Sequence, residues 1–195
     1  MEVTSLSISN MYLHGSLLTN LFRARKETFI DLKLWELPQA DGMEYDQYDT
    51  PACKWIAVHD GSEVVAGVRL MPTTVKVGMY SYMIRDAQRG LLPSIPDYLL
   101  DFDAPVDPEV WEATRIFVSR TVPATRRTQV QLELMQALIS EAHKAGAKKI
   151  LAFGPAVWPR WLGRLNLSAS AAGPKMILDG VEVQTAIMNI GHKRT

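Results

Sequence analysis

Two opposite charges stand inside a stretch that otherwise reads as a β-strand. Residues 111–120 are rich in β-branched and aromatic side chains, which favour extended structure. Glu112 and Arg115 are three positions apart, so on an ideal strand they face opposite sides and one of them points into a core or cleft. A carboxylate held there with little water has a raised pKa and can accept a proton from an amine. The alternative, which this stretch alone favours, is a structural Glu–Arg pair at the start of a strand.

A second group combines carboxylates with aromatic rings. Residues 40–51 form an acidic loop that contains Tyr45, Asp46, Tyr48 and Asp49, and Trp35 precedes it. Two carboxylates pair with an ammonium, and an aromatic face attracts an ammonium or a sulfonium. These residues therefore indicate a site for a cationic ligand. The alternative is an acidic surface loop, which is the more common case.

Basic residues gather in the second half of the chain. Arg126 and Arg127 end a predicted loop at 121–127, just before a long helix, where a bound anion would offset their unfavourable position. The alternative, equally open from the sequence, is two solvated arginines on a loop. Acyltransferase loops that bind coenzyme A usually contain several glycines, and residues 121–128 contain none. That favours a phosphate-bearing ligand held less closely, or one carried on another protein. Further basic residues that suit an acidic protein partner, or else a solvated surface, are Lys144, Lys148, Lys149, Arg160 and Arg164.

Length and composition limit the remaining possibilities. The 195 residues suggest one domain, and a formal net charge of zero provides no overall field to recruit nucleic acid or an anionic membrane. The single cysteine, Cys53, excludes an internal disulfide and a cysteine-based zinc site, and the histidines lack metal-ligand spacing. Neither a signal peptide nor an apolar run long enough to span a bilayer is present. We therefore expect a cytoplasmic protein without metal.

The expected elements mix helices with strands. Residues 1–20 are expected to be a short mobile lead. Hydrophobic periodicity and turn signals predict helices at 21–34 (capped by Asn20), 85–92, 128–145 and 158–165, and strands at 54–58, 63–72, 111–120, 149–153 and 181–190, with a hairpin turn at 59–62. Because the elements do not strictly alternate, they indicate a mixed-sheet α/β or α+β protein. A central strand followed by a loop and a helix N-terminus is the outline of a GNAT-like acyltransferase, a three-layer α-β-α sandwich.

Four motifs together resemble a known family, the acyl-homoserine-lactone synthases (LuxI-type autoinducer synthases). The resemblance covers roughly residues 20–165, with the motifs in the same order and at similar spacing. The motifs are Arg25-x3-Phe29-x5-Trp35, Glu44-Tyr45-Asp46-x2-Asp49, Gly67-Val68-Arg69-Leu70 and Trp111-Glu112-x2-Arg115.

The resemblance implies a reaction and roles for these residues. The family transfers an acyl group from acyl carrier protein to the amine of S-adenosylmethionine, then closes a lactone and releases methylthioadenosine. S-adenosylmethionine is a substrate, so no cofactor is implied. The whole chain would be one domain, with residues 1–50 on the S-adenosylmethionine side. Glu112 would be the general base, acting through a water. Residues implied to build or brace the S-adenosylmethionine pocket and its salt-bridge network are Arg25, Phe29, Trp35, Asp46, Asp49, Arg69 and Arg115.

The same resemblance suggests where the acyl donor binds, with acyl-CoA as the alternative to acyl carrier protein. Ala152, Phe153 and Trp158 are candidates for the acyl pocket, although aromatic residues there are more often plain core. Members that use 3-oxo chains carry a threonine where Ala152 stands, so we expect a non-3-oxo acyl group. The Arg-x-Gly-Trp pattern common near residue 164 is replaced by Arg164-Leu165-Asn166-Leu167. Candidate docking residues for the carrier are Arg126, Arg127, Lys148, Lys149, Arg160 and Arg164.

Two other functions are consistent with parts of the sequence. A GNAT enzyme that acylates another amine from acyl-CoA would explain the order of elements, but the glycine-free loop and the Trp35, Asp46 and Asp49 group disfavour it. A non-catalytic binding module is disfavoured by Glu112, since a pure binder requires no base at that position.

Overall fold

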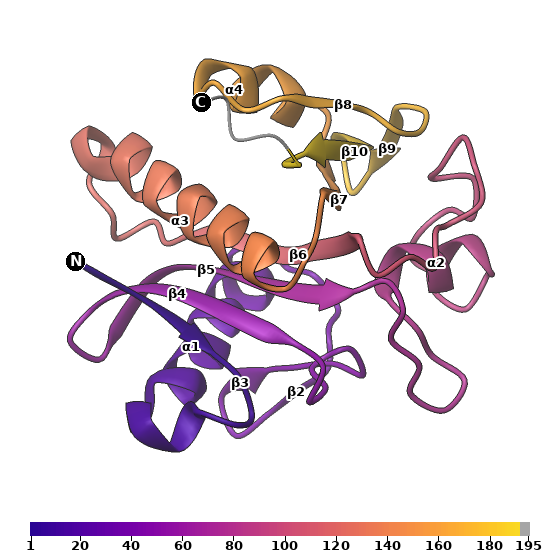
Figure 1. The fold of residues 1–195 in the computed structure, drawn as a ribbon. Coiled ribbons are helices and arrows are strands. Elements are labelled where there is room, and N and C mark those ends of the chain that lie inside the picture. The colour runs from indigo at the N-terminus through magenta and orange to yellow at the C-terminus, as the bar shows by residue number, and fades with distance from the viewer. Residues whose placement is uncertain (192–195) are drawn as a thin grey trace. The chain divides into compact units, whose positions relative to one another are not determined.

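The chain folds into two compact units. A computed structural model describes residues 1–191. Unit 1 contains residues 1–70 and 115–141, and unit 2 contains residues 71–114 and the chain from residue 142 onward (Figure 1). Three elements begin in one unit and end in the other: β5 (Glu63–Pro72), β6 (Val110–Val118) and α3 (Ala124–Lys144).

Unit 1 is built on three antiparallel strands in the order β1-β4-β5, which run beside one another in Figure 1. Register runs from Glu2↔His59 to Leu6↔Trp55 between β1 and β4, and from Lys54↔Leu70 to Asp60↔Glu63 between β4 and β5. The elements of unit 1, including the shared ones, are β1 (Glu2–Leu6), η1 (Met11–His14), α1 (Leu17–Arg25), η2 (Lys26–Leu32), β2 (Gln39–Ala40), β3 (Met43–Glu44), β4 (Lys54–Asp60), β5 (Glu63–Pro72), β6 (Val110–Val118) and α3 (Ala124–Lys144).

Gly67 allows α1 to pack closely on β5. A Cβ atom at this position would lie 2.5 Å from Leu21 Cδ1 and 2.8 Å from Phe117 Cε1, so any larger residue would overpack the contact. Leu21 and Phe117 are both buried. The absence of a side chain at residue 67 therefore sets how near the helix and the strand approach.

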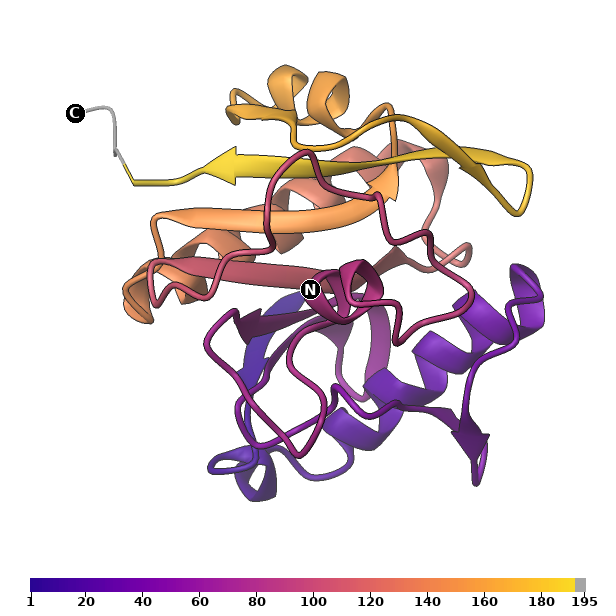
Figure 2. The same ribbon diagram turned by 90° about the vertical axis from the view of Figure 1, so that its right-hand side faces the viewer.

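Unit 2 contains a mixed sheet. β6 pairs parallel with β7, and β7 pairs antiparallel with β10, which lies beside it in Figure 2. β10 also pairs with β8 and β9. Parallel strands require a long crossover connection, and α3 supplies it between β6 and β7. The remaining elements of unit 2 are α2 (Met83–Gln88), β7 (Lys149–Pro155), α4 (Trp158–Arg164), β8 (Ala169–Ala171), β9 (Met176–Leu178) and β10 (Val181–Asn189).

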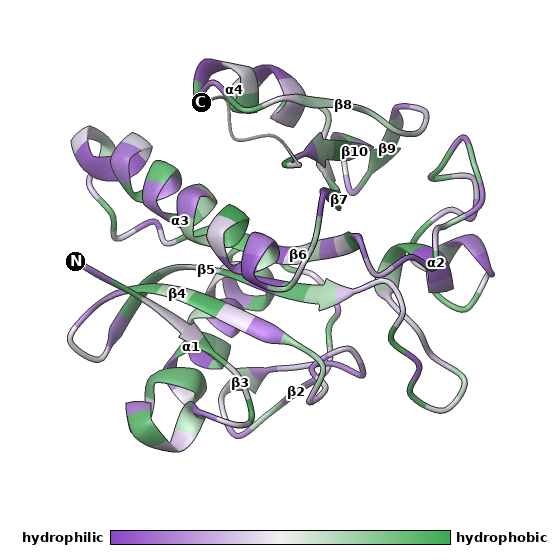
Figure 3. Ribbon diagram, viewed as in Figure 1, coloured by the Kyte–Doolittle hydropathy of each residue, from purple (hydrophilic) through white to green (hydrophobic). Residues whose placement is uncertain are grey.

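Periodicity predicted the major elements, including the long helix whose hydrophobic and hydrophilic bands alternate in Figure 3. The predicted start of the long helix at residue 128 is too late, since α3 begins at Ala124. Just before it, the Pro123 carbonyl oxygen accepts the Arg126 N–H. Arg126 and Arg127 therefore lie in its first turns and not in a loop. The short helix α2 is shorter than expected and begins at Met83.

The N-terminal expectations were wrong in two places. Residues 1–20 are not a mobile lead, because β1 pairs with β4 about fifty positions later, which local sequence does not reveal. The helix predicted at 21–34 starts at Leu17 and continues from Lys26 as a π-helix. This wider turn changes the period, and Leu32 of the predicted apolar stripe is exposed.

Two short hairpins were missed although each carries a strong turn signal. β2 and β3 flank Asp41-Gly42, and β9 and β10 flank Asp179-Gly180; all four residues have positive φ. Asp-Gly is favoured in two-residue hairpin turns because both central positions are left-handed. The prediction of an irregular loop over 40–51 was therefore wrong for its first residues.

The helices offer no membrane-spanning segment. Within residues 1–191, none of them is both long enough and apolar enough to cross a bilayer.

Cys53 is expected to be inert while the protein is folded. Its thiol donates a hydrogen bond to the Tyr48 carbonyl oxygen over 2.8 Å, and burial raises the pKa of the thiol to about 11. At pH 8 the reactive thiolate is therefore scarce and shielded. A thiol reagent such as dithionitrobenzoate should label Cys53 slowly in buffer and quickly in denaturant. Equal rates in the two solutions would contradict this prediction.

Candidate active site

A closed ring of buried charges occupies the interior of unit 1. Three arginines alternate with three carboxylates, and every carboxylate is shared by two arginines. The formal charge of this ring is zero, so its members compensate one another. In order, the charge ring consists of Arg25, Glu44, Arg115, Asp46, Arg69 and Asp49, which closes back on Arg25.

Arg25, at the end of α1, begins the ring with two carboxylates. Its Nε donates to Glu44 Oε2 over 2.6 Å, and its Nη1 and Nη2 donate to the two oxygens of Asp49 over 2.8 and 2.9 Å. The second contact is the two-pronged geometry for which a planar guanidinium is suited. Glu44 lies on β3 and has no exposed surface. The ring therefore joins α1 to β3 and to the loop that follows.

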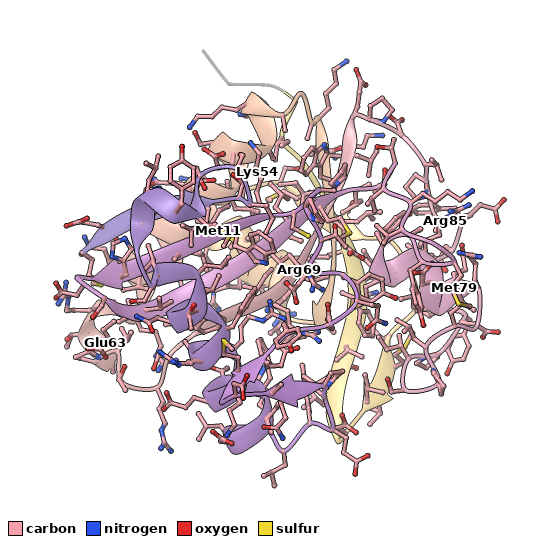
Figure 4. The ribbon with its side chains drawn as sticks, turned by 90° about the horizontal axis from the view of Figure 1, so that it is seen from below. Met11, Lys54, Glu63, Arg69, Met79 and Arg85 are labelled. Atoms are coloured by element: carbon pink, nitrogen blue, oxygen red, sulfur yellow. The ribbon has the colours of Figure 1, made fainter. Side chains whose placement is uncertain are left out.

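Arg69 and Arg115 close the other side. Arg69, on β5, donates from Nη1 to Asp46 and lies 3.1 Å from Asp49 Oδ2. Arg115, on β6, donates to Glu44 over 3.0 Å and to Asp46 over 2.8 Å. Figure 4 shows Arg69 among other side chains, whereas Glu63 at the opposite end of the same strand lies at the periphery.

Asp49 receives more hydrogen bonds than its arginines alone provide. Trp55 Nε1 donates to Oδ1 over 2.8 Å, and the Asp46 backbone N–H donates to Oδ2 over 2.9 Å. Burial by itself would raise the pKa of Asp49, but Arg69 and Arg25 outweigh it and hold that pKa well below its ordinary value. The carboxylate therefore stays ionised, as the ring requires.

Arg115 adopts a backbone conformation that is rare for its type. Its φ is 54°, in the left-handed region, which costs a residue with a Cβ about 1–2 kcal/mol. The simple alternation expected between Glu112 and Arg115 therefore fails at residue 115. Instead of pairing with Glu112, the guanidinium reaches Glu44 and Asp46, which corrects the structural-pair alternative. The strain is retained because the ring fixes this side chain.

Aromatic rings lie directly beside the charge ring. Phe29 and Trp35 stack with centroids 5.2 Å apart and planes inclined by 16°. Arg115 Cζ lies 5.8 Å from the Phe29 centroid, and Lys33 Nζ lies 5.0 Å from that of Phe29 and 4.7 Å from that of Trp35. Partial burial lowers the pKa of Lys33. Phe29 thus connects the charge ring to a more accessible aromatic surface.

Glu112 lies in unit 2, on the first half of β6, and has no exposed surface. Its oxygens accept the backbone N–H groups of Met83 (3.1 Å) and Ile84 (2.7 Å), the first residues of α2. Backbone N–H donors of this kind favour the charged form of a carboxylate. Burial raises the pKa of the neighbouring Tyr82, and the Glu112 charge raises it further.

Nearly the whole chain matches one protein family. The family model described as autoinducer synthase covers residues 9–191. The chain belongs to the autoinducer synthase family. An isovaleryl-homoserine lactone synthase of Bradyrhizobium diazoefficiens is 30% identical to it over 202 aligned positions, covering 98% of this chain and 84% of the relative. An acyl-homoserine-lactone synthase of Acinetobacter nosocomialis is 28% identical over 173 positions, covering 85% and 88%.

Solved structures agree with this autoinducer synthase in fold. A CoA-dependent acyl-homoserine lactone synthase, BjaI, solved with SAM and isopentyl-CoA, superposes with a TM-score of 0.77 at 26% identity, covering 98% of this chain and 83% of that one. TofI, solved with an inhibitor and MTA, gives 0.77 at 22% identity, covering 97% and 92%. An acyl-CoA N-acyltransferase from Pseudomonas aeruginosa gives 0.61 at 13% identity, covering 96% and 99%. The GNAT-like mixed α/β fold is therefore confirmed.

The chain is thus an acyl-homoserine-lactone synthase, an acyltransferase, as its motifs indicated. This family assignment decides against the two rival functions, an acyltransferase acting on another amine and a binding module. The predicted salt-bridge network of this synthase is also confirmed, since Arg25, Asp46, Asp49, Arg69 and Arg115 all lie in the charge ring.

One expectation for the acidic loop was wrong. Asp46 and Asp49 do not offer free charge to a cationic ligand, because arginines already occupy both carboxylates. The sequence reading also missed Glu44 as a member of the site, although it stands two positions before Asp46. A glutamate in a two-residue strand is locally unremarkable, and only the fold brings it between Arg25 and Arg115.

The acyl-pocket candidates divide between two faces of β7. Ala152 and Phe153 are consecutive on this strand, so their side chains point in opposite directions. The Trp158 ring lies 2.5 Å from where a Cβ of Gly154 would stand, so it covers the face that Gly154 shares with Ala152. Ala152 and Trp158 therefore lie on the same face of β7 and remain candidates for the acyl site, whereas Phe153 points to the opposite face.

The docking candidates are found in both units. Arg126, exposed, and Arg127, which donates to the Ser119 carbonyl oxygen over 3.0 Å, belong to unit 1. Lys148, Lys149, Arg160 and Arg164 are exposed in unit 2. Lys148 pairs with Glu109 over 2.6 Å, and Arg160 and Arg164 lie four positions apart on α4, which places them on one helical face.

Asp49→Asn should destabilise the synthase strongly. The substitution leaves Arg25 and Arg69 buried with too little negative charge, which should lower the free energy of unfolding by about 3–5 kcal/mol at pH 7. Because the pKa of Asp49 is lower in the folded chain than in the unfolded one, its contribution is present above about pH 4 and is lost as the pH falls further. Urea denaturation followed by tryptophan fluorescence, repeated from pH 7 to pH 3, measures both effects.

Asp31→Asn is the matched control. Asp31 pairs with Lys26 over 2.7 Å, but the pair is partly exposed, so its loss should cost less than about 1 kcal/mol. Similar unfolding curves for the two variants would contradict the role assigned to the charge ring.

Proposed function

We propose that this enzyme acylates S-adenosylmethionine and releases methylthioadenosine. In the first step the amine nitrogen attacks the thioester carbonyl carbon, a C–N bond forms, and the carrier thiol leaves after a proton is removed from the nitrogen. In the second step the carboxylate oxygen of the same molecule displaces the sulfonium, which closes the lactone and frees methylthioadenosine. The match to the autoinducer synthase family over residues 9–191, which spans both units, carries this proposal. The solved complex of BjaI with SAM supports the same substrate here.

The two units divide the work in this proposal but form one synthase domain over residues 1–195, as the extent of the family match suggests. Residues 1–50 belong to the S-adenosylmethionine side. Phe29 and Trp35 provide the aromatic surface that receives the positively charged nucleoside. The charge ring acts indirectly, because its carboxylates are already paired: it holds Phe29 and the loop of Asp46 and Asp49 in place.

Glu112 is the proposed general base, acting through a water. Amine attack needs a neutral nitrogen, so a carboxylate is required to accept the proton. The Met83 and Ile84 N–H groups fix the orientation of this carboxylate. Arg115 follows Glu112 by three residues, so the chain itself limits their Cα atoms to about 10 Å apart. Glu112 and Arg115, one member of the charge ring, therefore lie on the same strand.

Glu112→Gln tests this role. Glutamine keeps the size of the side chain but cannot take the proton, so the rate of methylthioadenosine release should fall about 10²- to 10⁴-fold. Mass spectrometry of methylthioadenosine and of the acylated lactone measures the rate, and circular dichroism checks the fold.

Glu112→Asp should recover part of the rate, since it restores the carboxylate. Glu182→Gln serves as control, because Glu182 is exposed and pairs with Lys175 over 2.9 Å. Wild-type turnover by Glu112→Gln would remove Glu112 from the mechanism.

The acyl donor is proposed to be an acyl group on acyl carrier protein. The carrier is strongly acidic and would meet the basic residues Arg126, Arg127, Lys148, Lys149, Arg160 and Arg164. Acyl-CoA is the second candidate, because BjaI was solved with isopentyl-CoA. Ala152, Phe153 and Trp158 are proposed to shape the acyl site, with Ala152 favouring a chain without a 3-oxo group. A cytoplasmic location belongs to this proposal, since both substrates are made there.

A donor panel tests the choice. We expect turnover with acyl carrier proteins bearing acyl chains without a 3-oxo group, and Arg164→Glu should raise the KM for the carrier severalfold while the KM for acyl-CoA changes little. Arg23→Glu, an exposed reversal on α1, is the control and should leave both values unchanged. Turnover with acyl-CoA alone would contradict the proposed carrier and would identify acyl-CoA as the acyl donor. No methylthioadenosine with any donor would overturn the proposed function.

A further inference from the structure

Lys33 places its own ammonium against the stacked pair formed by Phe29 and Trp35. The Nζ atom is 5.0 Å from one ring centroid and 4.7 Å from the other, and the centroids are 5.2 Å apart. The three points therefore form a nearly equilateral triangle, with the charge shared by both rings. Distances within about 6 Å allow a favourable cation–π interaction. The chain thus fills a cation position with one of its own residues.

The local backbone shows that this arrangement is built at a cost. Leu34, the next residue, has a φ of 57° although its side chain is 79% exposed and gains little from packing. A left-handed leucine costs about 1–2 kcal/mol. The turn brings the Trp35 N–H to the Phe29 carbonyl oxygen over 3.0 Å, which returns Trp35 onto Phe29 after the π-helix. The strained turn therefore serves the aromatic pair and places Lys33 beside it.

We propose that Lys33 is a tethered competitor for the sulfonium of S-adenosylmethionine on the Phe29–Trp35 pair. This inference rests on the proposed function, which brings that substrate to the same rings. Two cations that share one aromatic pair repel each other, so the ammonium must move aside when the sulfonium arrives. The Lys33 side chain is only partly buried and has several rotatable bonds, so it can move aside.

Competition of this kind distinguishes substrate from product. S-adenosylmethionine carries a positive sulphur, whereas methylthioadenosine is a neutral thioether. After lactone closure no charge remains to keep Lys33 away, and its ammonium returns to the rings. Lys33 therefore weakens substrate binding slightly and does not oppose departure of the neutral product. It acts as a specificity-determining residue for the charge state of the ligand.

Calorimetry on Lys33→Met tests the proposal with two ligands that differ in the charge of the sulphur. We expect S-adenosylmethionine to bind about 2- to 5-fold more tightly to the variant than to the wild type, which corresponds to an exposed cation–π contact. S-adenosylhomocysteine, with its neutral sulphur, should bind both proteins alike. Lys26→Met removes the same charge from the same helical segment, where Lys26 pairs with Asp31, and should change neither affinity.

Three results would overturn the inference: weaker binding of S-adenosylmethionine to Lys33→Met, an unchanged affinity, or equal tightening of both ligands. A Trp35→Leu variant, checked for folding by circular dichroism, separates this inference from the proposed function. If that variant binds S-adenosylmethionine as well as the wild type does, the substrate is not on these rings and both proposals about the pair fail. If Trp35→Leu weakens binding and Lys33→Met does not strengthen it, only the role of Lys33 fails.

Discussion

Burying six charges in one place is the constraint on which unit 1 depends. A single buried ion is costly because it loses its water, and a partner compensates only when the geometry is good. Here the charges form a closed ring. Each of the carboxylates Glu44, Asp46 and Asp49 contacts two arginines, and each arginine contacts two carboxylates. Removing any one member leaves two neighbours short of charge. The ring therefore connects α1, β3, β5 and β6 through charge-assisted hydrogen bonds.

Two residues with strained backbone conformations lie at the charge ring and beside the aromatic pair. Arg115 accepts a left-handed backbone to complete the ring, and Leu34 accepts one to return Trp35 onto Phe29. Phe29 is linked to both, since Arg115 lies over its ring and Trp35 stacks on it. The positions of Phe29 and Trp35 therefore depend on the backbone conformations of Arg115 and Leu34.

Glu112 illustrates a different way to hold a buried carboxylate. It accepts N–H groups from the backbone of Met83 and Ile84, whereas the carboxylates of the ring bind arginines. Two guanidinium contacts commit a carboxylate such as Asp46 to charged partners, whereas backbone N–H groups orient Glu112. The same functional group is structural in one setting and suited to proton transfer in the other.

The family, the mixed α/β fold and most members of the ionic network can be predicted from the amino-acid sequence, because they depend on residue types at fixed spacing and on hydrophobic periodicity. The two Asp-Gly hairpins are predictable in the same way, since their turn chemistry is local. The pairing of β1 with β4, the π-helix that contains Phe29 and the place of Glu44 in the charge ring appear only in the folded structure. Those features arise from contacts between residues far apart in the chain, and the types of the neighbouring residues do not specify such contacts. The placement of Lys33 on two rings belongs with them, because it follows from a turn whose conformation opposes the local preference of leucine.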